Sequence, residues 1–172
     1  MKIALIAAAA LIAMPAGAAL PVGAKAPDFQ TMGAKAGKTF PLKLSDALKR
    51  GPVVLYFFPA AFTPGCTIEA HEFAEATDDF AKAGATVIGM AGDSIDKLAK
   101  FSVEDCRNKF AVATATPELI KSYDVTLPQL STRSNRTSYV ISRGGRIAYA
   151  YSDKAPEAHI TNTLAAVRAL KK

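Results

Sequence analysis

The hydrophobic residues of this chain are grouped in short continuous runs and in longer stretches with helical spacing. Residues 52–58 form a continuous run rich in β-branched and aromatic side chains, which is typical of a strand buried on both faces. From residue 63 to residue 82 the apolar side chains recur at helical intervals, mostly separated by acidic residues, and Gly84 follows. The pattern predicts a central strand followed by an amphipathic helix.

The rest of the chain continues this alternation. Further strands are expected at residues 39–42, 85–91 and 110–114, and further helices at residues 94–108, 117–123 and 156–170. Residues 136–142 and 146–151 are expected to form two strands, because Gly144-Gly145 between them is a hairpin signal. The sequence therefore predicts an α/β fold with a central mixed β-sheet, parallel in its first part and flanked by helices on both faces.

Two shorter segments precede the first buried run. Residues 20–38 are rich in Gly, Ala and Pro, and we expect an extended arm there. Ser45 is expected to cap a brief helical turn that Gly51 and Pro52 end.

The first residues resemble a secretory signal peptide. Met1 and Lys2 give a positive start, residues 3–14 are apolar, and Ala16-Gly17-Ala18 supplies the small residues of a cleavage site. A retained membrane anchor is the alternative, but it needs roughly 17 to 25 apolar residues. We therefore predict a signal peptide at residues 1–18 and a mature domain at 19–172, which is periplasmic or secreted.

Composition narrows the range of partners. The chain has 172 residues, 50% hydrophobic content and a net charge of +6, which suits a single globular domain. Its Lys and Arg residues are scattered without aromatic interleaving, so we expect a solvated surface, no nucleic acid and no stable membrane association after cleavage. No nucleotide-binding glycine motif is present, and the two cysteines and two histidines do not have the spacing of a zinc site. We predict no cofactor and no metal.

The chemically informative residues surround Cys66, where the buried strand ends and the predicted helix begins. A cysteine in the first turn of a helix lies beside unpaired backbone N–H groups and the positive end of the helix dipole, and both stabilise a thiolate. An ordinary buried cysteine is the alternative. Thr63, Pro64 and Gly65 at this strand-to-helix turn favour a reactive thiol.

Pro59, Thr63 and Cys66 resemble the P-x-x-x-T-x-x-C signature of peroxiredoxins. The fuller T-P-G-C-T, followed by E-A, is similar to the bacterioferritin comigratory protein or peroxiredoxin Q subgroup. The resemblance covers nearly all of the mature chain, from G-x-x-A-P-D-F at residues 23–29 to R-x-x-x-x-I at residues 136–141. It implies a thioredoxin-like fold and a thiol-dependent peroxidase that reduces hydrogen peroxide and organic hydroperoxides.

The resemblance also implies a role for each matching residue. Cys66 corresponds to the peroxidatic cysteine, whose thiolate attacks a peroxide oxygen and becomes a sulfenic acid. Thr63 corresponds to the residue whose hydroxyl contacts both peroxide and thiolate, and Pro59 to the residue that walls the pocket. Arg136 corresponds to the arginine that stabilises the thiolate and the leaving oxygen, with Arg133 as the alternative.

The second cysteine departs from the commoner pattern. Many members of the subgroup carry a resolving cysteine five residues after the first, where this chain has His71. Five residues turn a helix through about 500°, so His71 is poorly placed to act as a base for Cys66 and is expected to be solvated or packed. Cys106 resembles the resolving cysteine that other members carry on the following helix. A static structural disulfide between Cys66 and Cys106 is the alternative.

These inferences define the expected reaction and its competitors. We expect a hydroperoxide substrate, an intramolecular disulfide, a thioredoxin-like reductant, and a monomer or weak dimer. A one-cysteine peroxidase and a non-enzymatic exported thioredoxin-fold module remain alternatives. A thioredoxin-like reductase would need a C-x-x-C motif, which is absent, and a Cys–His hydrolase would have only His71 or His159 as its base.

Overall fold

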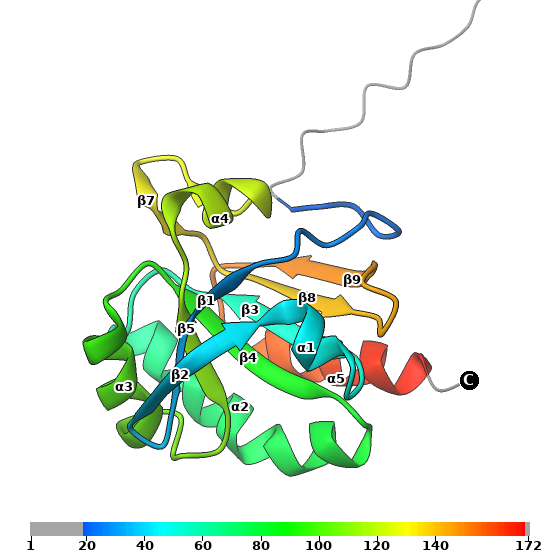
Figure 1. The fold of residues 1–172 in the computed structure, drawn as a ribbon, viewed down its shortest axis with the longest axis horizontal. Helices are drawn as coiled ribbons and strands as arrows, with labels where there is room; N and C mark the ends of the chain where they lie inside the picture. The colour runs from blue at the N-terminus through cyan, green and yellow to red at the C-terminus, as the bar shows by residue number, and fades with distance from the viewer. Residues whose placement is uncertain (1–18, 171–172) are drawn as a thin grey trace, which may run out of the picture.

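A seven-stranded mixed sheet forms the centre of the structure, a computed structural model that describes residues 19–170 (Figure 1). The strands are β1 (Gln30–Lys35), β2 (Lys38–Lys43), β3 (Val53–Phe57), β4 (Thr86–Ala91), β5 (Ala111–Thr114), β8 (Thr137–Ile141) and β9 (Ile147–Ser152), with a separate hairpin of β6 (Thr126–Leu127) and β7 (Leu130–Ser134). The helices are α1 (Leu44–Leu48), α2 (Pro64–Lys82), α3 (Ile95–Glu104), α4 (Pro117–Ser122) and α5 (Glu157–Ala169). The predicted signal peptide, residues 1–18, lies outside the described residues.

The strand order is β2-β1-β5-β4-β3-β8-β9. Strands β3, β4 and β5 are parallel, whereas β8 pairs antiparallel with β3 and β9 pairs antiparallel with β8. This arrangement confirms the predicted mixed sheet, which is parallel in its first part and is completed by a hairpin.

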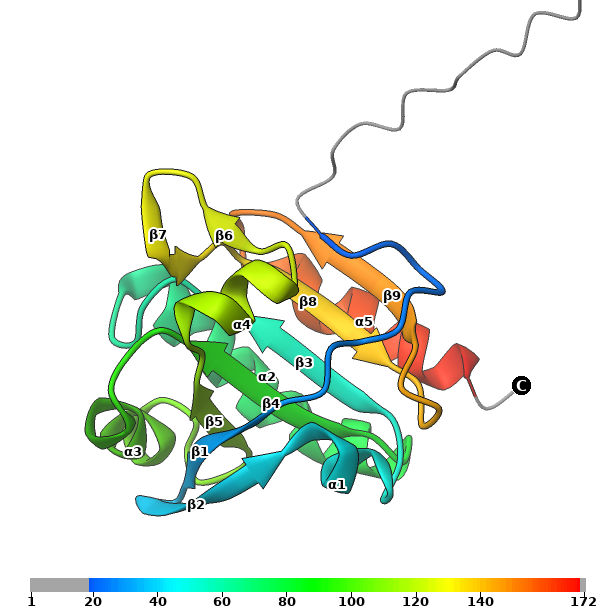
Figure 2. The same ribbon diagram turned by 45° about the horizontal axis from the view of Figure 1, so that its top comes forward.

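Both faces of the sheet are covered, as the apolar run of β3 predicts. Alternate side chains of a strand point to opposite faces. Tyr56 and Phe58 pack in the core beneath α2, α3 and α5, whereas Leu55 and Phe57 pack in the core on the side of α1 and α4. Figure 2 shows α1 and α4 in front of the sheet and α2 and α5 behind it.

The N-terminal region contains a strand where an extended arm was expected. Strand β1 pairs with β2 through a tight turn at Ala36 and Gly37, both of which have positive φ. Gly33 in β1 lies under Leu42, whose Cδ1 atom would be only 3.0 Å from a Cβ at that position. The glycine that weakens the local strand signal therefore permits close packing between the two strands.

The expected cap of the first helix was also wrong. Helix α1 begins at Leu44, with Lys43 as its N-cap residue, so Ser45 lies inside the helix. The backbone N–H of Ser45 donates to Asp28 Oδ1 at 3.0 Å. The Asp28 side chain thus accepts from a backbone N–H at the helix start, which an N-cap side chain would otherwise do.

Helix α3 ends at Glu104, before the predicted end at residue 108. Arg107 and Asn108 both adopt left-handed backbone conformations, with φ values of 49° and 61°. Such residues cannot continue a right-handed helix. Cys106 therefore lies in the turn after α3 rather than on the helix.

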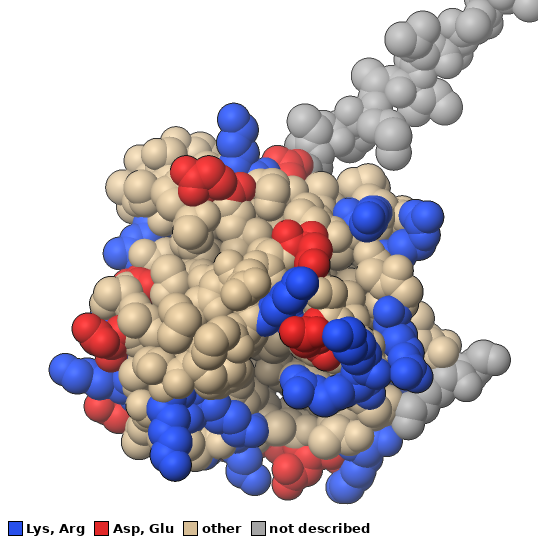
Figure 3. Space-filling view, viewed as in Figure 1, with Lys and Arg blue, Asp and Glu red and all other residues tan. Residues whose placement is uncertain are grey.

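The face of the molecule shown in Figure 3 carries charges of both signs. On the side shown in Figure 3, Lys and Arg side chains lie mainly around the lower and right-hand rim, with acidic side chains between them. No helix among residues 19–170 is long and apolar enough to cross a membrane.

Candidate active site

Cys66 lies in the first turn of α2, as the sequence predicts. Thr63 is the N-cap residue and Pro64 opens the helix, which makes Cys66 the third helical residue. The Cys66 side chain is buried, with 2% of its surface exposed. The Thr63 hydroxyl donates to the Ala60 carbonyl at 2.9 Å and leaves the helix-start N–H groups uncapped. Those N–H groups create a positive environment close to the thiol.

Arg136, the residue immediately before β8, places its guanidinium beside this thiol. Its Nη2 atom lies 3.6 Å from Cys66 Sγ, and its Nε atom donates to the Lys154 carbonyl at 3.0 Å. A Cβ atom at Gly65 would lie only 3.0 Å from Arg136 Nη2. The glycine of the P-G-C sequence therefore makes room for the guanidinium beside the thiol.

Glu69 is a third member of this cluster, and the sequence analysis assigned it no role. Its side chain is fully buried and its Oε2 atom accepts from Arg136 Nη1. Burial raises the pKa of Glu69 to about 8, although the Arg136 charge works in the opposite direction. The spacing offered a signal, because residues three apart on a helix lie on the same face and Glu69 is three residues after Cys66.

Arg136 is thereby shared between a carboxyl group and a thiol. Burial by itself would lower the pKa of Arg136, but the charges of Glu69 and Cys66 outweigh burial and raise it. The guanidinium remains a fixed positive charge in a site from which water is largely excluded, since only 8% of its side chain is exposed.

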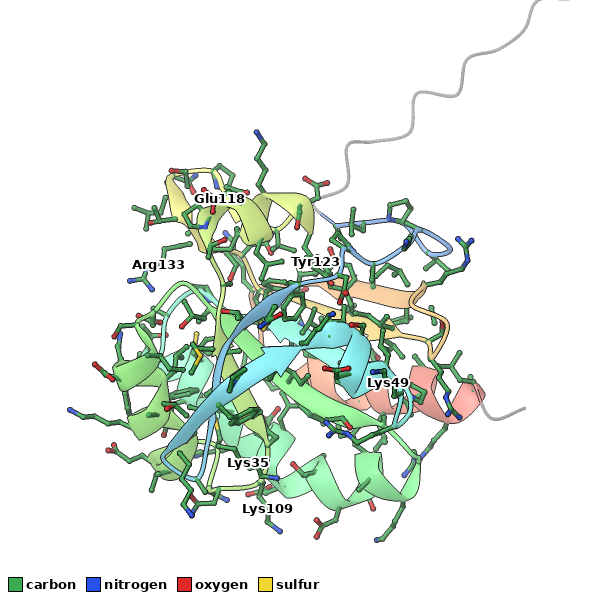
Figure 4. All side chains as sticks on the ribbon, in the orientation of Figure 1. Lys35, Lys49, Lys109, Glu118, Tyr123 and Arg133 are labelled. Carbon is green, nitrogen blue, oxygen red and sulfur yellow. The ribbon has the colours of Figure 1, made fainter. Side chains whose placement is uncertain are left out.

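Arg133, the alternative to Arg136, contacts a different group. Its Nη1 atom lies 2.9 Å from Asp93 Oδ1, and the buried Asp93 carboxylate also accepts from Lys97 Nζ at 2.9 Å and from the Ala61 backbone N–H at 2.8 Å. Figure 4 labels Arg133 at the edge of the molecule, between β7 and α3. Despite burial, these donors lower the pKa of Asp93.

The Asp93 cluster holds the loop that leads from β3 to α2. Pro59 is half-buried in this loop, and its carbonyl accepts from Arg133 Nη1 at 3.4 Å. Phe62 has a left-handed backbone, with φ 66°, and its ring packs edge-on against Phe101 at 5.3 Å between centroids. A left-handed aromatic residue costs about 1–3 kcal/mol, so the surrounding contacts must impose this conformation.

Cys106 is buried and is not bonded to Cys66. Burial and the neighbouring Asp105 both raise the pKa of the Cys106 thiol, which therefore stays protonated in this closed fold. Asp105 accepts from Thr67 Oγ1 at 3.1 Å and lies 3.1 Å from His71 Nε2. These contacts join the turn that carries Cys106 to the first turns of α2. His71 contacts Asp105 in the structure.

Away from Cys66, Arg136 and Glu69, a ligand would need a pocket and a metal ion would need a group of suitable side chains. A pocket of about 510 Å³, lined in part by Lys25, Leu44 and Gly145, does not include either cysteine. Within residues 19–170, the structure contains no group of three or more His, Cys, Asp and Glu side chains that could hold a metal ion.

The comparisons with known proteins agree with this geometry. The AhpC/TSA family profile matches residues 22–150. The chloroplast peroxiredoxin Q of Sedum lineare is 34% identical over 132 residues, which cover 76% of this chain and 70% of that protein. The chloroplast peroxiredoxin Q of Oryza sativa subsp. japonica is 33% identical over 146 residues, or 84% of this chain and 65% of that protein.

A solved structure extends the match to three dimensions. The crystal structure of peroxidoxin BcpB from Mycobacterium tuberculosis has 32% identity and a TM-score of 0.77, and the match covers 88% of this chain and 98% of that chain. The predicted thioredoxin-like fold is thus confirmed. A buried cysteine at a helix start, held beside an arginine in this fold, is the arrangement of a thiol peroxidase. The chain belongs to the AhpC/TSA family of peroxiredoxins, and the predicted similarity to peroxiredoxin Q is confirmed.

Proposed function

We propose that this chain reduces hydrogen peroxide and organic hydroperoxides through Cys66, with Cys106 resolving the oxidised enzyme as an intramolecular disulfide. The observation that carries the proposal is the 3.6 Å contact between Arg136 Nη2 and Cys66 Sγ at the start of α2. A positive charge and a helix N-terminus at one thiol both favour the thiolate, which is the nucleophilic form.

The first step transfers one oxygen atom to sulfur. The Cys66 thiolate attacks one peroxide oxygen, the O–O bond breaks, and Cys66 becomes a sulfenic acid while the second oxygen leaves as water or an alcohol after protonation. Arg136 would stabilise the negative charge that develops on the leaving oxygen. Thr63, with a hydroxyl that donates and accepts, would orient the peroxide, and Pro59 would wall the pocket.

The second step requires the site to open. Cys106 would attack the sulfenic sulfur, forming the disulfide and releasing water. Both cysteines are buried in the closed fold, so the first turn of α2 and the turn after α3 must separate from their neighbours before the sulfur atoms can bond. The Asp105 contacts with Thr67 and His71 would break in this opening.

The disulfide must then receive two electrons. A thioredoxin-like dithiol would attack it, release the two cysteines as thiols and leave with its own disulfide. One observation favours a second candidate cycle: Cys106 is fully buried, and burial raises the pKa of its thiol. In that one-cysteine cycle an external thiol would reduce the Cys66 sulfenic acid directly.

The expected result for Arg136→Ala is a slower reaction with peroxide in a protein that still folds. Removing the fixed charge withdraws its stabilisation of the thiolate and of the leaving oxygen, and loss of one such donor typically costs about 10²–10³-fold in rate. Stopped-flow measurement of hydrogen peroxide consumption by the reduced protein checks this. Arg133→Ala is the matched control, because Arg133 contacts Asp93 and not the thiol. A rate loss confined to Arg133→Ala would assign the charge to that residue instead.

We also propose that residues 1–18 direct export and are removed, so that the enzyme acts in the periplasm or outside the cell. The positive start, the apolar run and the small residues before Ala19 support this. Expression of the full chain in a bacterial host, followed by fractionation and N-terminal sequencing, should find a periplasmic protein that begins at Ala19. A cytoplasmic product that retains Met1 would contradict the proposal.

A further inference from the structure

A chain of buried polar contacts continues inward from Cys66. Arg136 contacts the thiol on one side and Glu69 Oε2 on the other, and Glu69 Oε1 has no hydrogen-bond partner. A second basic group, His159 on α5, is also near that oxygen, with its Nδ1 atom 3.8 Å away. Both the Glu69 and the His159 side chains are completely buried. An unpaired carboxyl oxygen beside a buried imidazole needs an explanation, because unpaired buried polar atoms are rare.

The other contacts of His159 determine where its proton lies. Its Nε2 atom is 3.1 Å from the Asp153 carbonyl oxygen, which can only accept a hydrogen bond, so Nε2 carries a hydrogen. Its Nδ1 atom is 2.8 Å from the Ser138 hydroxyl. Burial lowers the pKa of His159, and this favours the neutral ring in which Nδ1 accepts from Ser138.

In this neutral tautomer the single lone pair of Nδ1 is occupied by the Ser138 hydroxyl, and His159 donates no hydrogen bond to Glu69 Oε1. A buried carboxylate oxygen that receives no hydrogen bond is costly, and protonation of the carboxyl group removes the charge. We propose that Glu69 holds a proton at neutral pH, that the neutral His159 beside it helps to keep that proton in place, and that the proton frees the Arg136 charge to stabilise the Cys66 thiolate. His159 is then a positioning residue that acts on the reaction through Glu69 and Arg136.

The charge balance shows why such a proton matters. When Cys66 loses its proton and Glu69 holds one, the buried site contains one guanidinium and one thiolate. When Glu69 is ionised, its carboxylate competes for the same guanidinium, and a thiolate would add a second negative charge. Proton uptake by Glu69 and proton loss by Cys66 therefore support each other.

Several other groups face this pair. Arg136, just before β8, contacts Glu69, and the Arg136 charge also lowers the pKa of His159. Tyr56 on β3 is fully buried and within electrostatic range of Glu69, and Glu72 on α2 raises the pKa of Glu69 further. Asp153 contacts His159 through its backbone carbonyl. Compared with these neighbours, Glu69 is the group that both contacts Arg136 and takes up a proton near neutral pH.

The direction of the pH dependence follows. The pKa of Glu69 is about 8, so the carboxyl group is protonated below that pH and ionised above it. Peroxide reactivity should decline above about pH 8, as the Glu69 carboxylate recaptures Arg136. An ordinary thiolate reaction would show no such alkaline decline.

The test uses Cys106→Ser protein, so that Cys66 is its only thiol, and measures two quantities across pH: the rate with hydrogen peroxide and the rate of alkylation by iodoacetamide. In His159→Asn the amide can donate to Glu69 Oε1 and favours the carboxylate. The alkaline decline should move down by about one pH unit, which is a tenfold change in the proton affinity of Glu69. Alkylation reports the thiolate without any peroxidase activity, so failure of this inference is distinguishable from failure of the proposed function.

Ser138→Ala should shift the decline the other way. Without the serine hydroxyl, Nδ1 is free to accept from a protonated Glu69, so the decline should move to higher pH. Thr163→Val is the matched control, because Thr163 is buried on the same helix and its hydroxyl bonds only to the His159 and Ile160 carbonyls. It should leave the pH profile in place even if thermal unfolding shows a loss of stability.

A double-mutant cycle completes the test. Glu69→Gln should abolish the alkaline decline, and His159→Asn should have no further effect on the profile in that background. The inference is overturned if His159→Asn shifts the profile equally with Glu69→Gln present, or if neither His159→Asn nor Ser138→Ala moves it. Should His159→Asn fail to fold, the upward shift in Ser138→Ala decides the question by its presence or absence.

Discussion

Replacing Cys66 by serine should abolish peroxide reduction, with a loss of at least about 10³-fold in rate. A serine hydroxyl in the first turn of α2 remains protonated, so neither Arg136 nor the helix N-terminus can turn it into an equivalent nucleophile. The loss should appear in the first turnover, measured as peroxide consumed by stoichiometric reduced protein. Circular dichroism and thermal unfolding should show a folded domain, because serine is close to cysteine in size.

The matched control for this prediction is Cys106→Ser, which also removes one buried thiol. It should keep the first turnover within about twofold of the unmodified protein, since Cys106 does not take part in the attack on peroxide. Near-normal consumption of peroxide by Cys66→Ser would disprove the peroxidase mechanism proposed for this site.

In Cys106→Ser the second half of the cycle should fail. One equivalent of peroxide should convert the unmodified protein to a Cys66–Cys106 disulfide within one monomer, and digestion with mass mapping should identify it. Without Cys106 the sulfenic acid at Cys66 should persist or overoxidise, and dimedone should trap it. Turnover supported by a thioredoxin-like reductant should fall by at least about tenfold.

Two other results would change the assignment. An unchanged catalytic cycle in Cys106→Ser would identify a one-cysteine enzyme, in which an external thiol reduces Cys66 directly. A peroxide-induced dimer linked through Cys106 would show that resolution occurs between two chains. A disulfide that forms in air and resists the reductant would instead indicate the static structural bridge.

The proposed disulfide would require the turn that carries Cys106 to move. Asp105 joins the Cys106 turn to Thr67 and His71 on α2, while Arg107 forms a further ion pair with Glu75. We expect these contacts to break if the two cysteines form the proposed disulfide. The left-handed backbone at Arg107 costs about 1–3 kcal/mol, which lowers the free energy needed to rearrange that turn.

The position of Cys66 at the start of a helix was predictable because its causes are local. A buried strand, a proline at the first helical position and a cysteine two residues later place the thiol at a helix N-terminus whatever the rest of the chain does. Most of the strand and helix alternation was predictable for the same reason, since periodicity reports which faces are buried. The β1 strand and the β6–β7 hairpin were missed, because their short, Gly-containing or polar segments become strands only when they pair.

The partners of the two arginines were decided by strand pairing. Arg133 and Arg136 are three residues apart, and the motif favoured Arg136 without excluding Arg133. Strand β7 pairs with β6 outside the main sheet, and this pairing directs Arg133 to Asp93. Strand β8 pairs with β3 so that Thr137 lies opposite Phe57, and this register places Arg136 above the start of α2. Strand register depends on distant pairing, which no local pattern specifies.

His159 shows the same division at the opposite end of the chain. The sequence offered no specific contact for His159. The packing of α5 against α2 and β8 brings its ring to Glu69 and Ser138. The sequence by itself thus determined the fold class and the position of Cys66 at a helix start, since both follow from neighbours within a few residues. Only the tertiary structure decided which charges surround Cys66, because buried charges meet through the packing of elements distant in sequence.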